Sequence, residues 1–216
     1  MIHQESGVKK KKILYQGAEA IIYLGEYQGR ASIIKHRIPK SYRPTELDIK
    51  LRKFRTRREA KILRKARTTI SCPEIFRVDD RDMEIIMEYI DGLTLKKITE
   101  EASSLTMEIN MLYTKLGENI GKLHSIGIIH GDLTTSNIIV RDNMLFFIDF
   151  GLGFFSDSIE DKATDMHLLE RAIESTHYKW KKNLFDCVKK GYFLSSDVGE
   201  SVFQRIEVIE KRRRYT

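Results

Sequence analysis

The pattern of hydrophobic and polar positions changes near residue 90, from mostly strand-like to mostly helix-like. In residues 13–40, short β-branched and aromatic runs alternate with polar residues. We expect three antiparallel strands there, separated by Gly17, Gly25 and the Gln28–Gly29 pair. Two further strands are expected in EIFRVD and MEIIMEY, which the turn-like DDRD joins.

A long helix is predicted between these two groups of strands. The stretch Glu46–Arg67 favours helix and contains no glycine or proline. Pro44 and Thr45 precede it and suit the start of a helix. The first part of the chain is therefore expected to form one small antiparallel sheet with one long helix.

Beyond Asp91–Gly92 the apolar residues recur at spacings of three and four, which is typical of one face of an amphipathic helix. These residues are Leu105, Ile109, Leu112, Leu116, Ile120 and Leu123. Gly127 ends this pattern, and IIVRDNMLFFID predicts a strand hairpin that turns at Asp142–Asn143. Two more helices are expected, over about 160–177 and 197–212.

The pattern as a whole predicts an α+β fold in two lobes. Residues 1–90 would form the small lobe, an antiparallel β sheet with one long helix, and residues 91–216 a reduced, mostly α large lobe. The hinge is expected near Glu88–Gly92.

Composition places the chain among folded, water-soluble proteins. Of its 216 residues 41% are hydrophobic and 32% charged, and no apolar run approaches the length of about 18 residues that a membrane span needs. The N-terminus has no secretory pattern, so a cytoplasmic location is expected. Cys72 and Cys187 lack CxxC spacing and are expected to be reduced structural thiols.

Positive charge gathers in three clusters. The net charge is +7, and the clusters are Lys9–Lys12, the tail from Lys211 to Arg214, and residues 50–67. In the third cluster ten positions are Lys or Arg, and Glu59 is the single acid. Two interpretations of this helix are open. Either its basic residues form a solvated face, or they form a surface for RNA or an acidic partner, whose negative charge would relieve the repulsion among the lysines and arginines.

Candidate chemistry centres on HGDLTTSNIIV, residues 130–140. Asp132 could accept or orient the proton of an acceptor hydroxyl, and the Asn137 oxygen is a hard ligand suited to Mg²⁺. Asp149, in IDFGLG, stands seventeen residues after Asp132 and is the expected main magnesium ligand. Upstream, Lys35 in the strand ASIIK could meet phosphates, and Glu59 could position it through an ion pair.

Two polar residues near these groups are expected to be structural. His130 is predicted to anchor the loop by hydrogen bonds to the backbone. Asp165 is predicted to be a helix carboxylate that caps the backbone of the same loop.

HGDLTTSN, IDFG, the strand lysine and the helix glutamate together resemble the eukaryotic-type protein kinase fold, from Gln16 to about His177. The glycine-rich loop is reduced to QGAEAIIY, and Gly131 replaces the usual arginine before Asp132. No APE triplet follows IDFG. The resemblance therefore implies a stripped-down kinase without control by activation-loop phosphorylation.

Six stretches carry a more specific resemblance: QGAEA, IKHRIPKSYRPTELD, RREAKIL, HGDLTTSN, IDFGL and EDKATDMHLLERAIESTH. Together they are similar to the small atypical kinase/ATPase subunit of the KEOPS complex, a RIO-related family. This resemblance implies ATP and Mg²⁺ as cofactors. It implies Asp132 and Lys35 as catalytic residues and Asn137 and Asp149 as metal ligands. The implied nucleotide-binding residues are Gln16, Gly17, Ala18, Glu19, Ala20, Lys35, Glu59, Glu88, Tyr89 and Ile90.

The same resemblance implies a serine/threonine kinase or ATPase that supports threonylcarbamoyladenosine formation in tRNA. A sugar-kinase-like transfer subunit and a second small subunit on the small lobe are the implied partners. We expect tRNA to contact basic surfaces, including the helix of residues 50–67. The resemblance also implies that the basic tail KRRRYT lies near the nucleotide or the RNA. The alternatives are an aminoglycoside-type phosphotransferase, which also carries HGDLxxxN, and a non-catalytic scaffold with the same fold.

Overall fold

The computed structural model describes residues 8–213, with side chains through Lys211. Two compact units form. The first holds the described residues through Lys65 together with Pro73–Ile90, and the second holds Ala66–Cys72 and the described residues from Asp91 on. The predicted α+β class is confirmed, because the first unit contains an antiparallel sheet with one long helix and the second is mostly helical.

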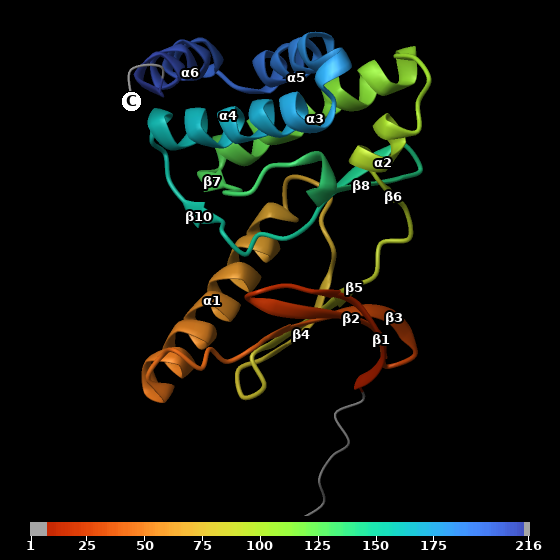
Figure 1. Ribbon diagram of the computed structural model, residues 1–216, viewed down its shortest axis with the longest axis vertical. Coiled ribbons are helices and arrows are strands. Elements are labelled where there is room, and N and C mark those ends of the chain that lie inside the picture. The colour runs from red at the N-terminus through yellow and green to blue at the C-terminus, as the bar shows by residue number, and fades with distance from the viewer. Residues whose placement is uncertain (1–7, 214–216) are drawn as a thin grey trace, which may run out of the picture. The chain divides into compact units, whose positions relative to one another are not determined.

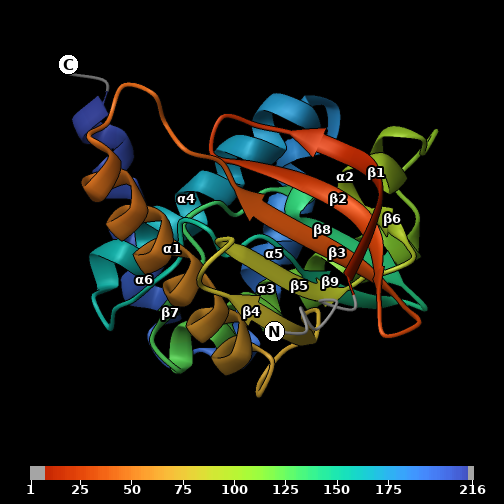
Figure 2. The same cartoon turned by 90° about the horizontal axis from the view of Figure 1, so that it is seen from below.

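The sheet of the first unit has five antiparallel strands in the order β1-β2-β3-β5-β4, which lie side by side in Figure 2. They are β1 (Val8–Gln16), β2 (Ala20–Tyr27), β3 (Arg30–Arg37), β4 (Ile75–Asp79) and β5 (Glu84–Glu88). The β2–β3 turn has φ of 50° at Gln28 and 79° at Gly29, as a tight hairpin turn requires. All five strands were predicted.

Two details of this sheet differ from the prediction. Gly25 does not separate strands but lies inside β2, where an added Cβ would collide with the Ile34 side chain and the Lys9 carbonyl oxygen. The cluster Lys9–Lys12 belongs to β1. Lys10 forms an ion pair with Glu84 at 2.5 Å, so part of this positive charge is balanced within the sheet.

The long helix of the first unit, α1, spans Thr45–Ala66, within one residue of the predicted bounds. Its first turn carries Glu46 and Asp48 and its last turn carries Arg64 and Lys65. This arrangement places acids near the positive end of the helix dipole and bases near the negative end, which stabilises both ends.

The second unit is built mainly from helices (Figure 1). Its helices are α2 (Leu95–Glu100), α3 (Met107–Ser125), η1 (Thr135–Asn137), α4 (Ile159–Thr176), η2 (Tyr178–Trp180), α5 (Lys181–Ser195) and α6 (Gly199–Arg213). Its strands are β6 (Leu93–Thr94), β7 (Ile128–Ile129), β8 (Ile138–Arg141), β9 (Met144–Phe147) and β10 (Phe154–Phe155). The β8–β9 hairpin turns at Asp142–Asn143 as predicted, with φ of 52° and 59°.

Helices α3, α4 and α6 were predicted, whereas α5 and the short α2 were not. In α5, lysines and a glycine interrupt the apolar positions, so its pattern is weak. The predicted basic tail falls largely outside the described residues, which leave out the side chains of Arg212 and Arg213 and all of residue 214. Among the described residues no helix is both long and apolar enough to cross a membrane.

Helix α3 packs closely against α5 at two glycines. An added Cβ at Gly117 would collide with the Val188 carbonyl oxygen, and one at Gly191 would collide with the Thr114 carbonyl oxygen. The two helix backbones therefore approach each other more closely than larger side chains would permit. Leu116, Ile120 and Tyr192 are fully buried near these glycines.

We expect Gly191→Ala to destabilise the protein, although alanine favours helix, because the new methyl group must push α3 and α5 apart. Overpacking of this kind costs about 1–3 kcal/mol. The urea unfolding midpoint measures the effect. Lys190→Ala is the control, since Lys190 is exposed on the same helix. Equal midpoints for the two variants would contradict the close approach.

Candidate active site

In the first unit, Glu59 of α1 binds two cations of β3 with its two carboxylate oxygens. Lys35 Nζ lies 2.6 Å from Glu59 Oε1, and Arg37 Nη2 lies 2.5 Å from Oε2. The side chains of Lys35 and Glu59 are only 9% and 3% exposed. The predicted ion pair between Lys35 and Glu59 is confirmed, whereas the part played by Arg37 was not foreseen.

The loop between β1 and β2, Gln16–Ala20, is held by polar contacts. The Gly17 amide donates to the Ala20 carbonyl at 3.0 Å, and Lys40 Nζ donates to the Ala18 carbonyl. The Glu19 carboxylate forms an ion pair with Arg55 of α1. These contacts give the loop a defined shape although it lacks the glycines of a typical phosphate-binding loop.

The predicted nucleotide residues Glu88, Tyr89 and Ile90 lie at the end of β5. The Glu88 amide donates to the Glu74 carbonyl at 2.8 Å, and the Tyr89 amide donates to the Ala31 carbonyl at 3.3 Å. Ile90 is buried, with 3% of its surface exposed. This segment is therefore anchored by its backbone to the first unit.

In the second unit, Asp132 and Asn137 lie together on the loop between β7 and β8. Asn137 Nδ2 donates to the Asp132 carbonyl at 2.9 Å and to Asp132 Oδ2 at 3.0 Å. The amide nitrogen is thus used within the loop, and Oδ1 remains as the acceptor that Asn137 can offer.

His130 joins this loop to the end of β9. Its Nδ1 accepts the Asp132 amide at 3.3 Å, so Nε2 carries the proton and donates to the Ile148 carbonyl at 3.1 Å. Burial lowers the pKa of His130, although Asp165, Asp149 and Asp132 oppose this shift. His130 is therefore neutral and bonds backbone groups on both sides, as predicted.

Asp149 follows Ile148 and is exposed, in the left-handed region of the backbone with φ of 60°. The Gly151 amide donates to Asp149 Oδ1 at 3.1 Å, a local bond of the kind that lets aspartate adopt this conformation. Asp149 and Asn137 provide carboxylate and amide oxygens, which are the donors that Mg²⁺ prefers. The residues of the second unit therefore fit a hard divalent cation.

Asp165 of α4 caps the same loop. Its two oxygens accept the amides of His130 and Gly131, each at 2.8 Å, and the residue is 1% exposed. Gly131 has φ of 78°, and an added Cβ there would lie 2.6 Å from the Leu152 carbonyl oxygen. The capping role predicted for Asp165 is confirmed, and the backbone explains why no arginine precedes Asp132.

Two further histidines support the loop, and no pattern in the sequence signalled either of them. His124 Nε2 lies 3.2 Å from Asp165 Oδ2, and His124 Nδ1 lies 2.8 Å from the Tyr192 hydroxyl. Burial raises the pKa of Tyr192 to about 12, so its hydroxyl stays protonated. This hydroxyl donates a hydrogen bond to His124 Nδ1. His177 Nε2 lies 3.1 Å from Thr135 Oγ1, and burial lowers the pKa of His177.

The predicted residues thus form two sets, each assembled within its own unit. Lys35, Glu59 and the segments Gln16–Ala20 and Glu88–Ile90 belong to the first unit. Asp132, Asn137 and Asp149 belong to the second. A strand lysine paired with a helix glutamate, and an HxD loop followed by Asp-Phe-Gly, define a protein of the kinase-like class.

Comparison with known proteins agrees with this class. Residues 31–190 match the RIO domain family. The chain is 48% identical to the KEOPS complex subunit Bud32 of Pyrococcus abyssi over 214 residues, which cover 94% of this chain and 96% of that protein. The chain therefore belongs to the RIO domain family and, within it, to the family of the KEOPS subunit Bud32.

Longer relatives also match. The chain is 43% identical to a "Probable bifunctional tRNA threonylcarbamoyladenosine biosynthesis protein" of Methanothermobacter thermautotrophicus, and 40% identical to a protein of the same description in Methanosarcina barkeri. These matches cover 100% and 97% of the chain but only 39% and 37% of the relatives. The chain thus spans less than two fifths of these two proteins.

We expect Asp165→Asn to loosen the loop around Asp132. Asparagine has one acceptor oxygen where the carboxylate has two, so one of the two loop amides loses its partner. A buried amide without a partner costs about 1–3 kcal/mol. Amide hydrogen exchange at His130 and Gly131 should accelerate, and the unfolding midpoint should fall.

Glu174→Gln is the matched control for this prediction. Glu174 lies on the same helix, but it is partly exposed and pairs with Arg171 and Lys181 at the surface. Its loss should change stability little, because ion pairs at the surface are screened by solvent. Unchanged exchange at His130 and Gly131 in Asp165→Asn would show that Asp165 does not hold the loop.

Proposed function

We propose that this protein is a Mg-ATP-dependent phosphotransferase and ATPase of the serine/threonine kinase type. It would act as a subunit of the KEOPS complex, in the formation of threonylcarbamoyladenosine in tRNA. The observation that carries the chemical part is the loop in which Asn137 holds the Asp132 carboxylate by a 3.0 Å hydrogen bond. The family and the descriptions of the relatives support the biological part.

Each residue of the second unit has a role in this proposal. Asp132, held by Asn137, would accept or orient the proton of the acceptor, which is a hydroxyl in a kinase and water in an ATPase. Asn137 Oδ1 and the Asp149 carboxylate would hold Mg²⁺. The bound metal supplies positive charge to the phosphate oxygens during transfer. His130 would keep Asp132 and Asp149 in fixed relation, because it bonds the Asp132 amide and the carbonyl that precedes Asp149.

The residues of the first unit would bind the nucleotide. Lys35 is expected to contact the α- and β-phosphates. Glu59 would hold the ammonium of Lys35 in one position, and the buried pair would keep it extended before the nucleotide arrives. The loop Gln16–Ala20 would cover the phosphates, and the segment Glu88–Ile90 would contact the base.

The proposal extends to partners and location. We expect a sugar-kinase-like threonylcarbamoyl-transfer subunit to bind this protein, and a second small subunit to bind its first unit. A cytoplasmic location is part of the same proposal. The description of the Pyrococcus abyssi relative as a complex subunit supports these expectations, as does the description of the longer relatives as bifunctional.

ATP turnover tests the proposed chemistry. We expect purified protein to release phosphate from Mg-ATP, and Asp132→Ala and Asp149→Ala to lower the rate at least about 100-fold, as loss of a positioned acid–base or metal-binding group does. Asp186→Asn is the control, since Asp186 is an exposed acid of the second unit outside the loop. Turnover should be measured alone and then with the transfer subunit and tRNA added stepwise.

The outcomes of this measurement separate the alternatives. A rate that rises only with the partners supports the ATPase subunit. Phosphate transfer to small alcohols would instead support a small-molecule phosphotransferase. If no preparation released phosphate above the Asp132→Ala background, the protein would be a scaffold and the enzymatic proposal would be wrong.

One face of α1 is the expected tRNA surface of the first unit. At 100° per residue, Lys50, Lys53, Arg57 and Arg64 fall on one side of the helix. Arg57 is already paired with Asp80. The structure gives Lys50, Lys53 and Arg64 no ion-pair partner among the described residues, so these three are the cations available for phosphates.

We expect tRNA affinity to fall steeply as salt concentration rises, because each neutralised phosphate releases counterions. Lys50→Ala with Arg64→Ala should lower the slope of log K against log salt by about 1 for each phosphate that the variant no longer neutralises. Arg57→Ala, which removes an already paired cation, is the control and should change the slope less. A flat salt profile, or equal slopes in the wild type and the double variant, would exclude α1 as a tRNA surface.

A further inference from the structure

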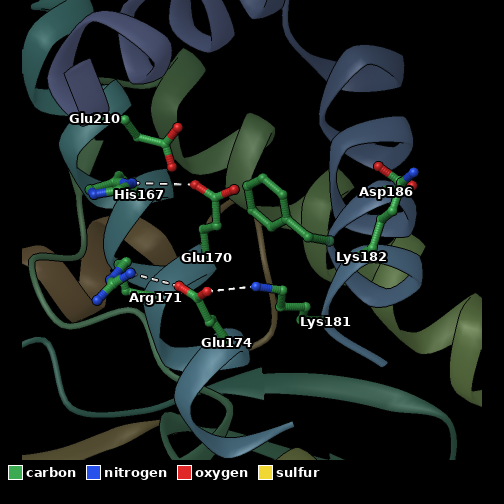
Figure 3. Close-up of a pocket in the computed structure, with 9 residues that line it drawn as sticks. His167, Glu170, Arg171, Glu174, Lys181, Lys182, Asp186 and Glu210 are labelled. Atoms are coloured by element: carbon green, nitrogen blue, oxygen red, sulfur yellow. Dashed lines mark hydrogen bonds and ion pairs between the residues drawn. The ribbon is translucent and has the colours of Figure 1, made fainter. Parts of the chain in front are cut away.

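A cavity of about 620 Å³ lies in the second unit, away from the loop that carries Asp132. Helices α4, α5 and α6 all contribute side chains to its lining, which Figure 3 shows. Its lining residues are His167, Glu170, Arg171, Glu174, Lys181, Lys182, Phe185, Asp186 and Glu210. The proposed phosphotransfer chemistry uses none of them.

At one end of the cavity, three groups that bind metals converge. His167 and Glu170 are three residues apart on α4 and therefore share a face, and Glu210 comes from the last turn of α6. One nitrogen or oxygen atom from each lies within 4.8 Å of the other two. His167 Nδ1 lies 3.3 Å from Glu170 Oε2, and Figure 3 shows the Glu210 carboxylate turned toward this pair.

Two acids at this end of the cavity, Glu170 and Glu210, have no lysine or arginine partner in the part of the chain that the structure describes. By contrast Glu174, one turn along α4, pairs with both Arg171 and Lys181. Burial and the Glu210 and Glu174 carboxylates raise the pKa of Glu170, while His167 opposes the shift. A cation between Glu170 and Glu210 would relieve the repulsion between their carboxylates.

His167 brings one ring nitrogen to the two carboxylates from a buried position. The residue is only 6% exposed, and its Nε2 is buried without a hydrogen-bond partner among the described residues. Its one hydrogen bond there is through Nδ1, on the side of the ring that faces the carboxylates. Nδ1 is thus the ring nitrogen that can serve as a metal ligand together with Glu170 and Glu210.

The geometry points to a binding site for a divalent transition-metal ion of the Zn²⁺ type, with His167 Nδ1, Glu170 and Glu210 as protein ligands and water in the remaining position. Ligand bonds of about 2.0–2.1 Å at a tetrahedral ion place two ligand atoms about 3.3 Å apart, which is the distance between His167 and Glu170. The nitrogen ligand favours Zn²⁺ over Mg²⁺ or Ca²⁺, because these harder ions select oxygen.

Such an ion would join two helices. It would tie the last turn of α6 to the middle of α4, the helix that also supplies Asp165 to the loop. The site is independent of the proposed ATP chemistry, so its test uses no activity measurement.

Metal binding should be measured directly on the full chain, stripped with chelator and kept in excess Mg²⁺. We expect one equivalent of Zn²⁺ in competition with a chromophoric chelator, and Co²⁺ should give the visible absorption of a tetrahedral site. Glu210→Gln should weaken Zn²⁺ binding at least tenfold and abolish the Co²⁺ spectrum. Glu210 is only partly buried, so this variant should fold normally.

Asp186→Asn is the matched control, because Asp186 lines the same cavity but lies outside the cluster. It should bind Zn²⁺ as the wild type does. Zn²⁺ should also slow amide exchange in the last turn of α6 in the wild type and in Asp186→Asn, but not in Glu210→Gln. Absence of Zn²⁺ binding by the wild type, or equal affinities of the wild type and Glu210→Gln, would overturn the site.

Discussion

The second unit depends on one buried carboxylate. Asp165 is 1% exposed and accepts the amides of His130 and Gly131, at 2.8 Å each. A buried charge is tolerated only when hydrogen bonds satisfy it, and here the backbone of the loop provides them. The loop and the helix therefore stabilise each other. The amides of His130 and Gly131 satisfy the buried Asp165 carboxylate, and this carboxylate holds the loop at Gly131, where φ is positive. Asp132 inherits its position from this arrangement.

The first unit uses a buried carboxylate in a different way. No backbone amide of residues 8–213 donates to Glu59, which binds Lys35 and Arg37 instead, one at each oxygen. These cations are two residues apart on β3 and so lie on the same face of the sheet. This explains the single acid among ten basic residues in residues 50–67: its carboxylate pairs with cations of the sheet. Glu59 thus holds the ammonium of Lys35 while it also binds Arg37.

Local patterns and the contacts within the kinase-like motifs were predictable from the sequence, whereas the other distant partnerships were not. The hairpin at Asp142–Asn143 follows from two turn residues between apolar runs, and the pairing of Lys35 with Glu59 follows from the order of the motifs. Arg37, by contrast, lies in the same strand as Lys35 and gives no sign that it shares Glu59. The hydrogen bond of His124 with Tyr192 spans 68 residues and depends on the close packing of α3 on α5. That packing requires α5, and this helix was not predicted because its hydrophobic and polar positions follow no clear helical period.

The departures from the common kinase pattern have a shared physical consequence. An arginine before the catalytic aspartate usually reads a phosphate on the activation loop, but the backbone at Gly131 leaves no space for any Cβ. The charge that organises this loop is Asp165, which is part of the fold and needs no modification. The loop Gln16–Ala20 is likewise held by Glu19 with Arg55 and by Lys40, where other kinases rely on flexible glycines. Both loops thus owe their shape to interactions within the protein that need no modification.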